Sequence, residues 1–261
     1  MSQSRTLFAR EQPMSAGGLA VKLLKILVLT YAVLWVYTRL FLQFVVEPSQ
    51  ITEVPYHGQS AHIFVVAFFV FFTPLLYGFN CLLARQWIRP QWPTLILYMG
   101  ATFACGVLCE IAFDSAFAHF LGRPAWEYRI WPVHNGYTSG ATAVVWAMYG
   151  FYLYFFHRML EIRRSPMADS IPAKGVLIAI DAMVLETLAN SFSLITFNVY
   201  YFYYFRPDLM NFTTWEIFIP YALCGLGGAF LLKLLDQKHY PKVLIGLAFY
   251  AVGLVEVFVW E

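Results

Sequence analysis

The sequence predicts an all-α integral membrane protein with seven transmembrane helices, and three observations lead to this prediction. Hydrophobic residues make up 60% of the 261 residues. Charged residues make up only 12%, whereas soluble domains contain about 25%. The apolar residues also fall into seven segments of about 20 residues, which is the length that a helix needs to cross a bilayer.

The seven expected spans share this length and a low content of charged residues. They are Ile26 to Val46, Ile63 to Leu83, Thr94 to Phe117, Gly136 to Phe156, Gly175 to Tyr200, Trp215 to Leu235 and Val243 to Trp260. Backbone polar groups inside hydrocarbon must be paired within their own segment, so each span is expected to be a helix. The chain therefore divides into a polar segment over residues 1–25 and a single membrane domain over residues 26–261.

The distribution of lysine and arginine predicts how these helices are oriented. With the N-terminus inside, 13 of the 17 Lys and Arg residues fall on the inner side, and Arg123, Arg129 and Arg206 fall outside. Inner loops carry the excess of positive charge, so the N-terminus is expected inside and the C-terminus outside. The bacterial cytoplasmic membrane and a eukaryotic endomembrane both fit. A net charge of +2 without a long basic run gives no indication of a nucleic-acid partner.

An internal repeat relates the third and fourth spans to the fifth and sixth. A shift of 76 residues aligns the segment EIAFDS at 110–115 with ETLANS at 186–191, and it also aligns Asn135 with Asn211 and Thr138 with Thr214. Under the predicted orientation both units cross from the inside to the outside and back. The repeat is therefore expected to be parallel.

The repeat carries carboxyl groups into the membrane. Residues four apart share a helix face, so Glu110 and Asp114 are expected to point the same way, as are Glu186 and Asn190. An ionisable residue inside a span is by default a functional hypothesis, and a protonated carboxyl in an apolar pocket is a general acid. Glu110, Glu186 and Asp114 are therefore the catalytic candidates. The structural alternative is that these polar groups hold helices together.

A further carboxyl, Asp181, lies outside the repeat and near the middle of its span. We expect it to make a packing contact with Arg39, which lies within the first span, or with another polar neighbour.

The loops after the two glutamate helices are expected to cover the site. A pseudo-two-fold arrangement would bring both polar faces to one cavity beneath these loops, which are rich in Trp, Tyr, Asn and Arg. The substrate-binding candidates are Asn190, Asn135, Asn211, Trp126 and Tyr128. The many aromatic side chains form either an interfacial belt or an aromatic wall that could hold a hydrophobic substrate or stabilise a cation on it.

The sequence gives no sign of a cofactor. The four cysteines lie inside apolar segments without a CxxC pair and are interpreted as small buried residues. The six histidines show no metal-ligand spacing. No metal and no other cofactor is therefore expected.

The order of residues after the first glutamate resembles a known family. Glu110 is followed by WEY at 126–128, Pro132 and NG at 135–136. This order resembles small polytopic proteins labelled as ABC-transporter permeases of the CmpB type, over roughly residues 100–156. In those proteins the aromatic motif is Trp-Asp-Tyr, so Glu127 stands where they have Asp.

A fainter resemblance, of architecture alone, is to the membrane carotenoid hydratases and the membrane terpene cyclases. The resemblance implies that the protonating acid would be Glu110 or Glu186.

The sequence therefore favours an integral membrane enzyme that acts by acid-base chemistry on a hydrophobic, isoprenoid or lipid-like substrate, for example a cyclase, hydratase or isomerase. Membrane lipid and the hydrophobic substrate are the expected partners. Two alternatives stay open, a permease-like transport component and a non-catalytic subunit of a membrane assembly. Spans two, four and seven are nearly all apolar, which disfavours transport.

Overall fold

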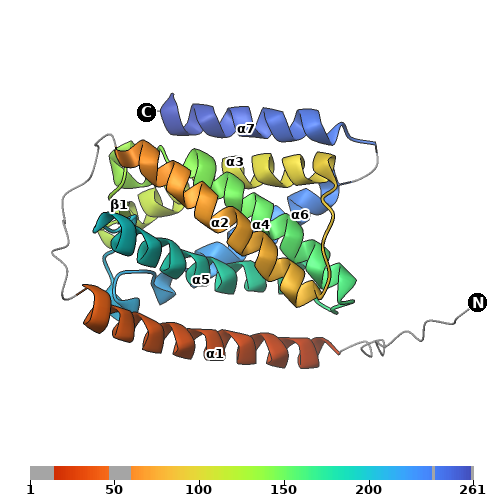
Figure 1. Cartoon of the computed structure of the whole chain (residues 1–261), viewed down its shortest axis with the longest axis horizontal. Coiled ribbons are helices and arrows are strands. Elements are labelled where there is room, and N and C mark those ends of the chain that lie inside the picture. Colours follow the sequence, from red (N-terminus) through yellow and green to blue (C-terminus); the bar gives the residue numbers. More distant parts are fainter. Residues whose placement is uncertain (1–14, 47–59, 237–238, 260–261) are drawn as a thin grey trace, which may run out of the picture.

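The computed structural model describes residues 15–46, 60–236 and 239–259. Seven α-helices form the described part (Figure 1): α1 (Ala16–Phe41), α2 (Ser60–Ala84), α3 (Trp92–Leu121), α4 (Thr142–Ile162), α5 (Ile171–Phe197), α6 (Phe218–Leu235) and α7 (Lys242–Phe258). A short π-helical stretch, Leu42–Val46, extends α1. Residue 260 of the last predicted span and residues 1–14 of the polar segment lie outside the described residues.

The helices pack as two hairpins with further helices along their sides. One hairpin is α3 with α4, the other is α5 with α6, and α3 also contacts α6. Helix α7 runs along α3 and α1 runs along α5, on opposite sides of the molecule (Figure 1). The backbones of α3 and α7 nearly touch, since a Cβ added to Gly100 would lie 1.9 Å from the carbonyl oxygen of Gly246. Small residues permit such close packing of apolar helices.

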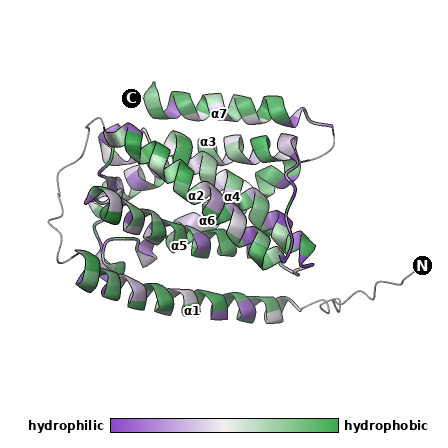
Figure 2. Ribbon diagram, viewed as in Figure 1, coloured by the Kyte–Doolittle hydropathy of each residue, from purple (hydrophilic) through white to green (hydrophobic). Residues whose placement is uncertain are grey.

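Within the described residues, four helical segments have the length and apolar composition needed to cross a membrane: Ala16–Val45, Ala61–Ala84, Trp92–Leu121 and Trp215–Leu235. Large apolar side chains on the outside of the described structure stay uncovered, among them Leu29 (67% exposed) and Leu82 (74% exposed). Figure 2 shows the hydrophilic residues gathered toward the helix ends and the connecting segments. An apolar exterior of this extent is unfavourable in water, so these features indicate a membrane protein.

The predicted helical fold is confirmed, and within the described residues four short strands, which the prediction did not include, lie between the helices. They are β1 (Trp126–Tyr128), β2 (Pro132–Val133), β3 (Thr138–Ser139) and β4 (Phe202–Tyr204). Strand β1 pairs antiparallel with β4, and β2 pairs antiparallel with β3. We call residues 122–141 and 198–217 the cap. The cap lies at the end of the bundle where α3 and α5 end and α4 and α6 begin, on the left in Figure 1.

Several predicted span boundaries were also wrong. Helix α1 begins at Ala16 and not at Ile26, because the Ser15 hydroxyl caps it by accepting from the Gly18 N–H (3.1 Å). Helix α3 ends at Leu121 and not at Phe117, where Gly122 adopts a left-handed conformation (φ 70°).

Helix α4 begins at Thr142 and not at Gly136, because the Ser139 hydroxyl donates to the Ile130 carbonyl (2.7 Å) and accepts from the Ala141 N–H (3.1 Å). These bonds hold residues 138–139 as a strand. Helix α5 ends at Phe197 because Asn198 adopts a left-handed conformation (φ 55°) that closes the helix.

Candidate functional site

Glu110 lies on α3, and its carboxyl group accepts hydrogen bonds from two hydroxyl groups of the cap. The Tyr128 hydroxyl donates to Oε1, and the Thr138 hydroxyl donates to Oε2 at 2.6 Å. Glu110 is only 4% exposed. A buried carboxyl group without bonds would be costly, and these two hydroxyl groups satisfy both of its oxygens.

Glu186 lies on α5 and is held in a similar way by three hydroxyl groups. The Tyr204 hydroxyl donates to Oε1 at 2.5 Å, the Tyr221 hydroxyl donates to the same oxygen, and the Thr213 hydroxyl donates to Oε2 at 2.6 Å. Tyr204 follows Glu186 by 18 residues, as Tyr128 follows Glu110. Each glutamate lies about 16 Å from the cap end of its helix, at about 1.5 Å per residue.

Asp114 and Asn190 anchor the cap to the two glutamate helices. Asp114 Oδ1 accepts from the backbone N–H of Ala125 (2.6 Å) and of Trp126 (3.4 Å). Asn190 Oδ1 accepts from the N–H groups of Tyr201 (3.0 Å) and of the next residue (3.3 Å), and its Nδ2 donates to the Phe212 carbonyl (3.0 Å). Both side chains are fully buried. These contacts fix the start of β1 and the start of β4.

The two halves of the cap match in their backbone conformation at the same spacing of 76 residues. Gly122 ends α3 with a φ of 70°, and Asn198 ends α5 with a φ of 55°. Asn135 (φ 56°) and Asn211 (φ 64°) are both left-handed, a conformation that Asn tolerates better than most residues. In the β1–β4 ladder, Trp126 lies opposite Tyr204, and Tyr128 lies opposite Phe202. Exchanging the two halves leaves this register unchanged.

The two glutamates border one cavity, which we call the acid cavity, with an empty volume of about 620 Å³. Tyr128 and Tyr221 line it beside their carboxyl partners. No lysine, arginine or histidine belongs to its lining in the part of the chain that the structure describes. Its walls are otherwise apolar and aromatic, and they consist of Phe68, Phe72, Leu76, Val145, Trp146, Met148, Tyr149, Ala182, Leu185, Ala189, Tyr201 and Phe202.

The remaining predicted binding residues lie outside the acid cavity. The Trp126 indole donates to the Tyr137 carbonyl at 3.0 Å, and Trp126 lines a neighbouring cavity. The Asn211 side chain donates to the Tyr204 carbonyl at 2.6 Å. Asn135 is exposed at the surface of the cap. The structure therefore brings together Glu110, Glu186 and Tyr128 in one lining, and it places the other candidates in or behind the cap.

Asp181 contacts polar neighbours on α4 and not Arg39. Its carboxyl group accepts from the Tyr152 hydroxyl (2.8 Å) and the Tyr149 hydroxyl (3.4 Å). Arg39 instead lies over the ring of Trp35, 5.3 Å from the ring centroid.

The two cap tyrosines stay protonated over a wide pH range. Burial raises the pKa of Tyr128 and of Tyr204 well above the ordinary value of 10, and the nearby carboxyl groups raise it further. Both phenols therefore remain hydrogen-bond donors to the glutamates.

Several site residues were missed by the sequence interpretation. Tyr204 could have been found, because the 76-residue shift aligns it with Tyr128. Thr213 could not have been found in this way, because the 76-residue shift aligns Thr138 with Thr214 and not with Thr213. Glu216 was also missed. Its carboxyl group accepts hydrogen bonds from Arg123 (3.1 Å) in the first half of the cap and from Arg206 (2.8 Å) in the second half.

Metal ligands do not cluster in the described ranges, where no group of three His, Cys, Asp or Glu side chains is arranged to hold an ion. In the comparisons with known proteins, no protein-family model matched the chain, and neither curated proteins nor solved structures gave a significant match.

Proposed function

We propose that the chain crosses the membrane seven times, with the N-terminus inside, the C-terminus outside and a parallel repeat of α3–α4 and α5–α6. The matched contacts of Asp114 and Asn190 support the repeat. So do the helix boundaries, because α3 and α5 end, and α4 and α6 begin, at the same spacing of 76 residues. Under this orientation the cap lies on the outer side.

We propose that the protein is a membrane-embedded enzyme that acts by acid-base chemistry on an apolar, isoprenoid or lipid-like substrate. The observation that carries this proposal is that Glu110 and Glu186 border one cavity with an otherwise apolar and aromatic lining. An apolar molecule is the occupant that such walls favour, since they would leave most polar groups of a hydrophilic solute unpaired. Two carboxyl groups in one apolar site can divide the roles of acid and base between them.

In the proposed reaction, Glu110 gives its proton to one carbon of a carbon–carbon double bond, and the second carbon becomes cationic. The electron pair of the double bond forms the new C–H bond, and Glu110 becomes a carboxylate. Glu186 then takes a proton from a carbon next to the cation, which restores a double bond at a new position. Aromatic faces such as those of Phe68 and Tyr201 stabilise the cation while it exists.

The hydroxyl groups around the two carboxyl groups suit both protonation states. A hydroxyl can donate to a carboxylate and accept from a protonated carboxyl, so Tyr128 and Thr138 can hold Glu110 before and after proton transfer. Glu186 receives three hydroxyl donors, which suits the residue that takes the proton. Glu110 is therefore assigned as the acid and Glu186 as the base.

Comparison of lipid extracts tests this function. Cells that supply isoprenoid precursors would express the wild type, Glu110→Gln or Glu186→Gln at matched protein levels, and mass spectrometry would compare their membrane lipids. Asp181→Asn is the matched control, because Asp181 is also an intramembrane carboxyl but lies outside the cavity lining. A product present with the wild type and the control, and absent with both glutamate variants, would support the proposal. Identical extracts from all four strains would contradict it and favour a role of the glutamates in helix association.

A further inference from the structure

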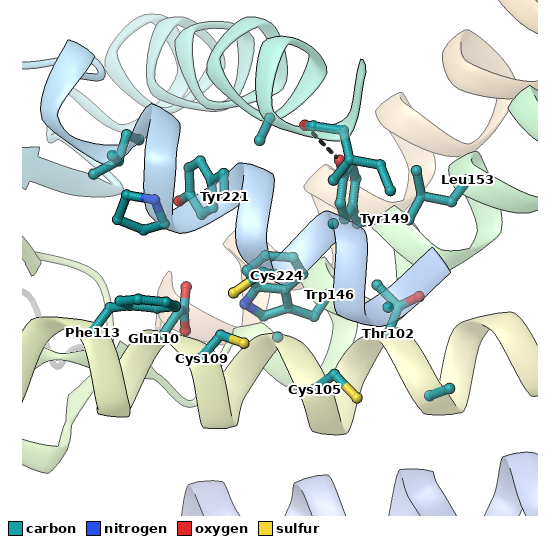
Figure 3. A pocket seen from close by; sticks show the side chains of 18 of the residues that line it. Thr102, Cys105, Cys109, Glu110, Phe113, Trp146, Tyr149, Leu153, Tyr221 and Cys224 are labelled. Atoms are coloured by element: carbon teal, nitrogen blue, oxygen red, sulfur yellow. Dashed lines mark hydrogen bonds between the residues drawn. The ribbon is translucent and has the colours of Figure 1, made fainter. Parts of the chain in front are cut away.

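A second cavity, with an empty volume of about 800 Å³, lies beside the acid cavity and plays no part in the reaction described above. Three of the four cysteines line it, and we call it the thiol cavity. Figure 3 shows Cys109 on α3 facing Cys224 on α6, with Cys105 further along α3. The rest of its lining is almost entirely apolar, with Ile178, Leu231 and Leu232 among its members.

We infer that the mouth of the thiol cavity lies between α3 and α6, because both helices contribute partly exposed residues to its lining. Some lining residues of these two helices, among them Cys109, Cys224 and Gly228, are partly exposed, whereas Leu153 of α4 and Ile178 of α5 are buried. Apolar side chains surround the mouth on the outside of the helices, among them Leu108 (46% exposed), Leu223 (55%) and Phe230 (59%). In a membrane, the medium at this mouth is the hydrocarbon of the bilayer.

The thiol cavity and the acid cavity share a wall. Both are lined by Glu110, Trp146, Tyr149, Ala182 and Tyr221. Glu186, in contrast, lines only the acid cavity of the two. Figure 3 shows the carboxyl group of Glu110 projecting from α3 into the space between α3 and α6, beside Phe113 and Cys109. Glu110 therefore stands where a chain lying in the thiol cavity would meet the acid cavity.

We infer that the thiol cavity binds the hydrocarbon chain of a membrane-dissolved molecule, which enters between α3 and α6 with one end directed toward Glu110. Among the described residues, the lining offers no charged group other than Glu110 for a polar headgroup, and burial of hydrocarbon against apolar side chains needs none. Binding of the chain does not depend on catalysis. Only the statement that its reactive end lies at Glu110 rests on the proposed function.

Two neighbouring glycines of α6 provide a matched pair of variants. A Cβ added at Gly227 or at Gly228 would meet nothing within 4 Å, so a side chain at either position begins in open space. Gly228 lines the thiol cavity, whereas Gly227 is exposed on the outside of the helix. Gly228→Leu should therefore fill the cavity, and Gly227→Leu should add a leucine to the outer surface. Cys224→Phe, one turn away from Gly228, fills the cavity independently.

The test is photolabelling of the full chain in liposomes, with the labelled peptides identified by mass spectrometry. The two probes are diazirine derivatives of geranylgeraniol and of stearyl alcohol, which distinguish an isoprenoid chain from a straight acyl chain. The inference predicts labelling of the α3 and α6 segments that line the cavity by at least one probe. Gly228→Leu should reduce this labelling at least fivefold, and Gly227→Leu should leave it within twofold of the wild type.

Three results would overturn the inference: no labelling of these segments by either probe, undiminished labelling in both Gly228→Leu and Cys224→Phe, or an equal loss in Gly227→Leu. Should Gly228→Leu fail to fold, as judged by size-exclusion chromatography, Cys224→Phe decides. Glu110→Gln and Glu186→Gln should still be labelled, because their loss of activity leaves the cavity in place. Failure of the proposed function and failure of this inference are thereby distinguished.

Discussion

The anchoring of the cap by Asp114 leads to a prediction in which two substitutions at one position should differ. In Asp114→Ala, the buried N–H groups of Ala125 and Trp126 lose the oxygen that accepts from them. A hydrogen bond contributes about 0.5–1.5 kcal/mol net, and an unpaired buried donor costs about 1–3 kcal/mol. Since the second bond is long, we expect Asp114→Ala to lower the free energy of unfolding by about 2–4 kcal/mol.

Asp114→Asn should be tolerated, because Asn190 makes the same contact to the second half of the cap with an amide oxygen. Asp114 Oδ2 has no hydrogen-bond partner among the described residues, so replacing this oxygen by an NH₂ group breaks no bond seen there. We expect a change of about 1 kcal/mol or less. The reverse substitution, Asn190→Asp, should cost more, because it replaces the donor to the Phe212 carbonyl by a second acceptor.

Thermal unfolding in detergent, followed by circular dichroism, measures these differences. At about 2–4 °C per kcal/mol for a chain of this size, Asp114→Ala should lower the midpoint by about 4–16 °C, and Asp114→Asn by at most about 4 °C. The wild type and Asn190→Asp would be measured in the same detergent. Equal midpoints for the two Asp114 variants would refute the reasoning, because the acceptor oxygen would then not be what matters.

Three further predictions concern helix contacts, the carboxyl partners and pH. Gly100→Val should lower the free energy of unfolding by about 3 kcal/mol, because its Cβ would collide with the backbone of α7. Gly78→Ala should not destabilise, because nothing lies within 4 Å of a Cβ at that position. Chemical unfolding of both variants compares the two effects. Tyr128→Phe should lower the free energy of unfolding more than Tyr204→Phe does in the same assay. Without the Tyr128 hydroxyl, Glu110 keeps one hydroxyl donor, whereas without the Tyr204 hydroxyl, Glu186 keeps two. Burial raises the pKa of both phenols, so the stability that they contribute should be complete below about pH 10 and lost as the pH rises further. As the pH rises above about 10, the unfolding midpoint should fall less steeply in a variant that combines Tyr128→Phe with Tyr204→Phe than in the wild type. An equal slope in both proteins would contradict a contribution of these two phenols to stability.

The helices could largely be predicted from the sequence because hydrocarbon length and apolar composition determine them. The start of α4 could not, because residues 136–141 are apolar or small and their strand conformation depends on the Ser139 hydroxyl and its partners. A hydropathy pattern contains no information about such hydrogen bonds. The close approach of Gly100 to Gly246 likewise depends on which helices become neighbours.

The sequence predicted which residues belong to the candidate site better than it predicted the contacts that they make. Internal alignment pointed to both glutamates, and they do border one cavity. Helix periodicity put Asp114 on the face of Glu110, but it could not tell that the aspartate bonds to the cap backbone. The gathering of Cys105, Cys109 and Cys224 around one cavity was missed, because it depends on the contact between α3 and α6.

The most direct test of the central claim is incorporation of solvent deuterium into an apolar substrate. The purified wild type, Glu110→Gln and Asp181→Asn would each be placed in liposomes that contain a mixed isoprenoid fraction, in buffer made with D₂O. Because the proposed acid exchanges its proton with solvent and delivers it to carbon, the wild type and Asp181→Asn should yield an isoprenoid that is heavier by one deuterium. Glu110→Gln should yield none. Absence of deuterated product with the wild type, or equal amounts with Glu110→Gln, would contradict acid catalysis by this residue.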